Sequence, residues 1–130
     1  MATISGAADL EPIVLSNNAD WSEAQALVQD DGATAYPLPD GCTARMELRA
    51  NAESAGVALL CTSETGELSF APADAGAGDP YWWLVIEVPA ERMGRVPEGE
   101  YLRDMLIFHD GQTIYGGRGE VAVVRGITRF

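Results

Sequence analysis

The sequence predicts an all-β protein, an antiparallel sandwich of about seven or eight short strands. Apolar segments of strand length are separated at regular intervals by turns rich in Gly, Pro, Asp and Asn. Residues 43–49 alternate between apolar and charged side chains, which is typical of a strand with one buried face. No segment has the apolar spacing of a long amphipathic helix. Together these features specify two packed sheets.

The chain is large enough for one packed domain. It has 130 residues, of which 47% are hydrophobic and 22% charged. We divide it into an N-terminal arm, residues 1–12, and a sandwich domain, residues 13–130. The arm has no strand or helix periodicity and ends at Pro12. We expect it to extend from the domain and to lie on a partner or a neighbouring copy.

The first half of the domain contains three expected strands. Residues 13–15 form a short one, and residues 21–28 form a longer one before the Asp31-Gly32 turn signal, although their alanine and glutamine content also permits a helix. Two prolines place residues 37–41 in a loop. Residues 43–49 are the clearest strand, with Ala44, Met46 and Leu48 on the buried face.

Residues 57–61 and 67–70 flank a short polar turn, and this spacing predicts a hairpin. Residues 71–80 are a glycine-rich acidic loop. Residues 81–88 are aromatic and β-branched, which makes them the strongest strand signal in the chain. One helical turn is expected within residues 89–95.

The last part of the chain is expected to form three strands. Residues 101–108 form the first, and a tight connection at residues 109–112 leads into the second, residues 113–115. Gly116-Gly117 is expected to end that strand, so that residues 121–124 form the last one.

The charge balance restricts the partners. Eight basic residues, all of them arginine, stand against 20 acidic ones, so the net charge is −12. Repulsion from phosphates therefore argues against nucleic-acid binding. No apolar run approaches the roughly 20 residues that span a bilayer, and the first ten residues lack the basic and apolar regions of a signal peptide. We expect a protein made in the cytoplasm, with no membrane contact.

Few residues suggest catalysis. His109 is the only histidine and lies beside the turn residues Asp110-Gly111, so we expect it at a loop rim. Cys42 and Cys61 are interpreted as small core residues rather than as a disulfide or a zinc site. The glycines around Arg118 precede a strand, whereas a phosphate-binding loop precedes a helix. We expect no enzyme activity, no cofactor and no metal.

Trp82 and Trp83 are adjacent, so in a strand they point to opposite faces. One is expected to fill the core and the other to anchor an interface. Either can be the exposed one, and Trp82 is included among the candidate contact residues. Tyr36 and Tyr115 are further candidates for contact.

Several short motifs carry a family resemblance. They are Asp20-Trp21, Asp31-Gly32, Gly41-Cys42-Thr43-Ala44 leading into residues 43–49, Gly66-Glu67-Leu68-Ser69-Phe70, residues 84–91, Gly99-x-Tyr101-x-x-Asp104, and residues 119–123 with 126–129. In this order and spacing, residues 20–129 resemble the small immunoglobulin-like domains of tailed bacteriophages and prophages. The N-terminal arm, the tryptophan pair and Arg118 depart from that pattern.

The resemblance implies an immunoglobulin-like sandwich with a structural role in the virion and no enzymatic site. We therefore expect a tail or baseplate protein, assembled in the host cytoplasm, that binds other virion proteins or further copies of itself. The arginines of residues 81–130, Arg103 among them, are expected to pair with acidic residues of another copy. The candidate contact residues are Ile4, Leu10, Trp82, Arg92, Arg95, Arg118, Arg125 and Arg129.

Three alternatives remain open. The first is a capsid decoration or head-fibre protein. The second is a carbohydrate-binding module that stacks Trp82 or Trp83 on a host-surface glycan. The third is a small hydrolase that uses His109 as its base.

Overall fold

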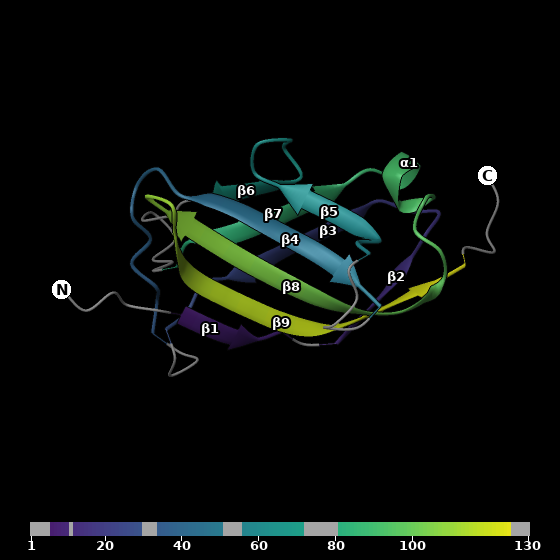
Figure 1. Cartoon of the computed structure of the whole chain (residues 1–130), viewed down its shortest axis with the longest axis horizontal. Coiled ribbons are helices and arrows are strands. Elements are labelled where there is room, and N and C mark those ends of the chain that lie inside the picture. Colours follow the sequence, from purple (N-terminus) through teal and green to yellow (C-terminus); the bar gives the residue numbers. More distant parts are fainter. Residues whose placement is uncertain (1–5, 11, 30–33, 51–55, 72–80, 126–130) are drawn as a thin grey trace.

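The strands form two facing sheets in an immunoglobulin-like β-sandwich, the fold class that the sequence predicts (Figure 1). The computed structural model describes residues 6–10, 12–29, 34–50, 56–71 and 81–125. The larger sheet has the order β1-β9-β8-β4-β5, with β2 also paired to β9, and the smaller sheet has the order β3-β7-β6. The bounds are β1 Gly6–Asp9, β2 Ile13–Ser16, β3 Trp21–Ala26, β4 Thr43–Arg49, β5 Leu59–Thr62, β6 Leu68–Ala71, β7 Trp83–Val88, α1 Ala90–Met93, β8 Gly99–His109 and β9 Gln112–Val124.

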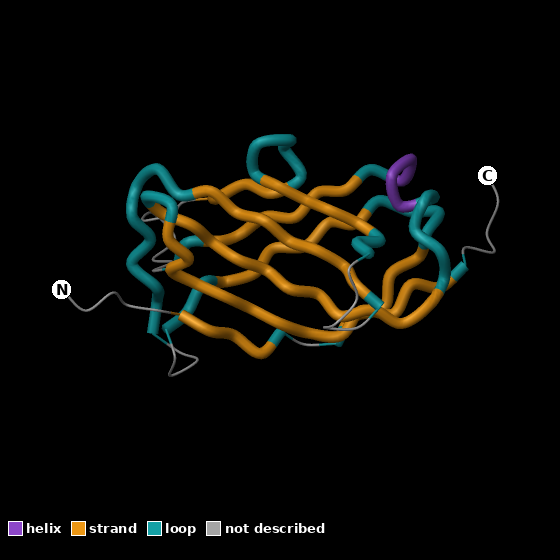
Figure 2. The backbone as a smooth tube through the Cα atoms, viewed as in Figure 1, coloured by secondary structure: helices purple, strands orange, loops and turns teal. Residues whose placement is uncertain are grey.

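Strands make up most of the described chain, and α1 is a single helical turn, as expected (Figure 2). The alternation predicted for β4 is confirmed, because Ala44, Met46 and Leu48 are all buried. On the facing sheet, Leu84 and Ile86 of β7 are buried in the same core. Inward side chains of the two sheets therefore form one continuous core.

A buried ion pair joins the two sheets. Arg103 of β8 is only 1% exposed, and its Nη1 donates to both carboxylate oxygens of Glu23 on β3, at 2.8 and 3.0 Å. Trp21, on the same face of β3, donates from Nε1 to Glu23 Oε1 at 3.1 Å. The Arg103 Cζ lies 5.9 Å from the centroid of the Trp21 ring, within cation–π range. The expectation that Arg103 pairs with another copy is therefore wrong.

The position of Arg103 has a counterpart in antibody domains. The Tyr101 hydroxyl donates to the carbonyl of Pro97 at 2.6 Å, which is the arrangement known as a tyrosine corner. In antibody domains the corner tyrosine comes two residues before a cysteine that forms the disulfide between the sheets. In this chain Arg103 occupies the position of that cysteine, two residues after Tyr101, and both Cys42 and Cys61 are free thiols. An ion pair thus takes the place of the disulfide.

The N-terminal segment differs from the expected arm. β1 runs parallel to β9, with Gly6 opposite Tyr115, and Leu10 is 5% exposed and donates its N–H to the Arg118 carbonyl at 2.9 Å. β2 also pairs with β9 in parallel, so the larger sheet is mixed rather than purely antiparallel. Residues 6–10 therefore belong to the sandwich of their own chain. Residues 1–5 and residue 11 lie outside the described part.

β9 is continuous where the sequence predicted a break. A Cβ at Gly119 would lie 2.7 Å from the Leu10 carbonyl oxygen and 2.8 Å from its Cβ, and one at Gly117 would lie 3.1 Å from Met105 Cε. These glycines thus allow another segment to approach a strand closely, which is a known use of glycine inside a sheet. Nothing within residues 113–124 reveals the approaching residue, because Leu10 is far away in sequence.

The connection between β5 and β6 was also predicted wrongly. β5 pairs with β4 in the larger sheet, whereas β6 pairs with β7 in the smaller one, so the turn between them crosses from sheet to sheet and is no hairpin. By contrast, the tight turn between β8 and β9 is confirmed. Asp110 and Gly111 have φ angles of 51° and 77°, which fit a two-residue type I′ hairpin.

The ion pair gives a first prediction. Glu23→Gln leaves the Arg103 guanidinium buried without its counter-charge, so the free energy of unfolding should fall by about 3–5 kcal/mol. The double variant E23L/R103M replaces both charges with apolar side chains and should recover most of that loss. Urea unfolding followed by tryptophan fluorescence measures both. A loss below about 0.5 kcal/mol for E23Q, the range of ordinary surface changes, would show that the pair does not hold the sheets.

The packing of Leu10 gives a second prediction. Gly119→Ala forces a methyl group against the Leu10 backbone, so unfolding free energy should fall by about 1–3 kcal/mol. The Leu10 amide should also lose protection from hydrogen exchange. Gly116→Ala is the matched control, because its new Cβ meets nothing closer than 3.6 Å. Equal stability of the two variants would contradict the close contact.

Candidate functional site

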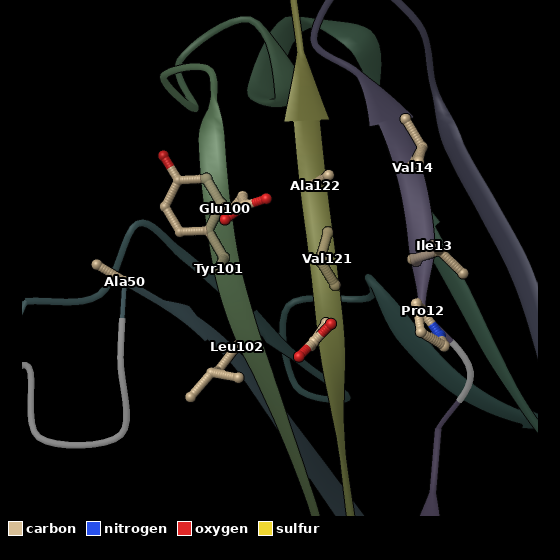
Figure 3. A pocket seen from close by; sticks show the side chains of 10 residues that line it. Pro12, Ile13, Val14, Ala50, Glu100, Tyr101, Leu102, Val121 and Ala122 are labelled. Carbon is tan, nitrogen blue, oxygen red and sulfur yellow. The ribbon is translucent and has the colours of Figure 1, made fainter.

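A groove of about 410 Å³ lies on the outer face of the larger sheet, where β2, β9 and β8 run side by side (Figure 3). Its volume falls within the range of about 300–1,000 Å³ found for ligand sites. Val14, 70% exposed, lies on β2 along one side of it. The lining residues are Pro12, Ile13, Val14, Ala50, Glu100, Tyr101, Leu102, Glu120, Val121 and Ala122.

The strand register arranges two carboxylates around an apolar centre. Ala122 of β9 lies opposite Glu100 of β8 on one side and opposite Val14 of β2 on the other. In the next outward row of the same face, Glu120 lies opposite Leu102. Glu100 and Glu120 are therefore diagonal neighbours, with Cα atoms about 7–8 Å apart. The small Ala122 side chain keeps the space between them open.

The charges next to the groove are already paired with each other. Arg45 and Arg49 of β4 both contact Glu47, each with Nη2 at 2.6 Å from a carboxylate oxygen. Burial alone would raise the pKa of Glu47, but the hydrogen bonds from both arginines outweigh burial and lower that pKa. The charged side chains that line the groove itself are Glu100 and Glu120. The groove therefore favours ligands that carry a positive charge.

Nucleophilic and basic side chains lie elsewhere. His109 is at the hairpin end of β8, opposite to the groove, and its Nδ1 is 3.6 Å from an Asp110 carboxylate oxygen. Burial raises the pKa of the Cys61 thiol to about 12, so it stays protonated. Cys42 is half-buried against the core, and its Sγ lies 3.0 Å from the Pro39 carbonyl. Within the described residues, no three His, Cys, Asp or Glu side chains gather as for a metal.

The apolar contact candidates face inward. Leu10 is buried against β9, and Trp82 is half-buried and packed on the core. Trp83 takes the outward position on β7 and packs edge-on against Tyr81 at 6.4 Å, which answers the open question of which tryptophan faces outward. Tyr36 and Tyr115 are buried and pack edge-on at 5.1 Å. The prediction that these two are contact residues is therefore wrong.

The arginine candidates divide into two groups. Arg92 binds within its own chain, with Nη1 3.0 Å from Glu67 and Nη2 donating to the Leu60 carbonyl. Arg118 of β9, Arg95 just after α1 and Arg125 just after β9 are exposed and remain available for contact. Ile4 and Arg129 lie outside the described residues.

The sequence did not reveal the groove itself. Its residues come from four separate segments, and the parallel pairing of β2 with β9 brings Val14 beside Ala122. Alternation alone places Glu100 and Leu102 on one face of β8, and Glu120 and Ala122 on one face of β9. This alternation can be read from the sequence, but the pairing register between β8, β9 and β2, which sets the neighbours of each residue, cannot.

Comparison with known proteins adds little. No protein-family model matches the chain, and no curated protein matches it. Among solved structures, it is similar to the NK cell receptor Nkp44, described as a triggering partner in natural cytotoxicity. Identity is 14% over 92% of this chain and 100% of that one, with a TM-score of 0.38, and we base no argument on so distant a similarity. In the described part of the chain, no helix has the length and apolarity needed to cross a membrane.

Glu67 yields a prediction on pH dependence. Burial alone would raise the pKa of this carboxyl, but hydrogen bonds from Thr65, from the Thr62 amide and from Arg92 lower it. A carboxyl with a lowered folded-state pKa stabilises the protein above its unfolded pKa, and that contribution is lost as pH falls through the folded value. Unfolding free energy should therefore drop less between pH 7 and pH 3 in E67Q than in the parent. Urea titrations at both pH values test this, and E64Q, in the same turn but exposed, should follow the parent.

Proposed function

We propose that this chain is a non-enzymatic docking module, an immunoglobulin-like domain that binds other proteins of a symmetric phage tail or baseplate. The observation that supports binding is the groove, whose centre is apolar and whose charged lining residues are Glu100 and Glu120. The virion setting is supported by the resemblance of residues 20–129 to phage immunoglobulin-like domains.

The geometry suits attachment by an outer face. The ion pair and the single core keep the two sheets rigid, so a partner binds without a large ordering cost. Exposed Arg95, Arg118 and Arg125 add charged contacts around the molecule. Many weak contacts repeated by symmetry give firm attachment without high individual affinity. Because Leu10 is buried in its own chain, docking in this proposal depends on sheet faces rather than on an extended arm.

Capsid decoration uses the same properties and differs in the particle part that is bound. A glycan-binding role has one observation in its favour, the Tyr81–Trp83 pair on the outer face of the smaller sheet. Trp83 lies between Ala26 and Ala71 in the sheet, so its neighbours on both adjacent strands are small.

The proposal is tested by assembly. The chain should co-sediment with phage particles induced from the bacterium that encodes it, and antibodies against it should label the tail end in electron micrographs. Ala122→Trp, which fills the groove, should reduce incorporation at least about tenfold, equivalent to about 1.4 kcal/mol. Ala24→Trp, on the outer face of the smaller sheet, is the matched control and should incorporate normally.

Three results would count against the proposal. Absence of the parental chain from particles removes the virion role. Labelling of the head identifies decoration instead. Loss of incorporation with A24W alone moves the contact to the smaller sheet, beside Trp83.

A further inference from the structure

We infer that the groove receives an arginine side chain, presented by an extended segment of a partner protein other than this chain. The inference rests on the docking role proposed above and names the chemistry of its partner.

The arrangement of the lining residues fits a guanidinium group. Glu100 and Glu120 are diagonal neighbours on β8 and β9, about 7–8 Å apart at Cα, with their carboxylates on one face. A guanidinium has five N–H donors in a planar fork, so it can bind two carboxylates at once from a position between them. Lysine has a single ammonium group and lacks that planar reach.

Glu100 and Glu120 belong to two neighbouring cross-strand pairs, and the remaining two residues of these pairs, on the other diagonal, are apolar. Leu102 and Ala122 occupy that diagonal, and Val14 extends the apolar surface toward β2. Arginine buries its methylene stem on such surfaces while its charged end meets polar groups. The groove therefore matches both parts of an arginine side chain.

Both carboxylates are available. Among the described residues, neither the Glu100 nor the Glu120 carboxylate makes a side-chain hydrogen bond or an ion pair. The basic side chain nearest in register, Arg49, lies opposite Leu102 and is held by Glu47 through Nε at 2.8 Å and Nη2 at 2.6 Å. Arg118, two residues before Glu120 on β9, is exposed and makes no ion pair with a described residue.

The net charge argues for a different protein as partner. Each copy of this chain carries −12, so two copies repel each other over long distances. A segment with arginine between apolar residues is attracted instead. The groove follows the strand direction of β2, β9 and β8, which suits an extended segment whose alternate side chains face the sheet.

The test uses the whole chain, labelled with ¹⁵N, and the probe peptide acetyl-Val-Thr-Arg-Thr-Val-amide, in which both valines share a face with the arginine. Amide signals of Val14, Leu102 and Ala122 should shift saturably as the peptide is added. A peptide with citrulline in place of arginine keeps the shape and loses the charge, and it should bind at least tenfold more weakly.

Paired variants separate the site from general attraction. E100Q/E120Q should weaken arginine-peptide binding at least tenfold. E64Q/E98Q removes the same charge at exposed positions outside the groove and should keep the parental affinity. Because the substitutions are on the surface, unchanged amide spectra elsewhere will show that both variants are folded.

Several outcomes overturn the inference. Equal weakening in both double variants means non-specific attraction, and equal binding of the citrulline peptide removes the role of the guanidinium. Saturable shifts confined to residues outside the groove place the peptide elsewhere. Concentration-dependent shifts of Val14 and Ala122 without peptide identify a second copy as the occupant. Peptide binding is measured on the isolated chain, so it succeeds or fails independently of incorporation into particles.

Discussion

The ion pair between Arg103 and Glu23 is the constraint on which the rest of the sandwich depends. A buried guanidinium costs several kcal/mol unless a counter-charge meets it, so β3 must hold Glu23 opposite Arg103 on β8. Trp21 adds a ring beside the guanidinium and a hydrogen bond to the carboxylate. The Arg103 Nε still has no hydrogen-bond partner among the described residues, which is a cost that the surrounding core must offset. In return, the sheets are joined without a disulfide, so their attachment does not depend on the redox state of the cell.

With the sheets fixed, the glycines of β9 decide how the edge of the larger sheet is completed. Gly117 and Gly119 of β9 leave space for Leu10. The chain then continues into β2, which also pairs with β9. That path puts Val14 beside Ala122 and creates one side of the groove. The proposed docking site is thus a consequence of close backbone packing that begins at Leu10.

Signals contained within a few residues allowed correct prediction. The alternation of residues 43–49 and the Asp110-Gly111 turn are such signals, and both are confirmed. The errors concern features set by distant partners, namely the crossing after β5, the continuity of β9 and the inward position of Arg103. No local signal marked Arg103, because both alternating faces of residues 101–108 carry three apolar or aromatic side chains and one charged side chain. Leu10 was expected to contact a partner, although apolar side chains of this size are more often buried in their own chain.

The groove residues show why charge pattern is more informative about contact than apolar character in this chain. On the outer face of the larger sheet, Glu47 is neutralised by two arginines of its own strand. Glu100 and Glu120 make no ion pair with described residues, although Arg118 is only two positions from Glu120. Exposed carboxylates lose little by staying in water, so leaving them free costs the fold almost nothing. Their attraction for a cation remains available to a partner, and the apolar side chains between them supply the contact area that water cannot.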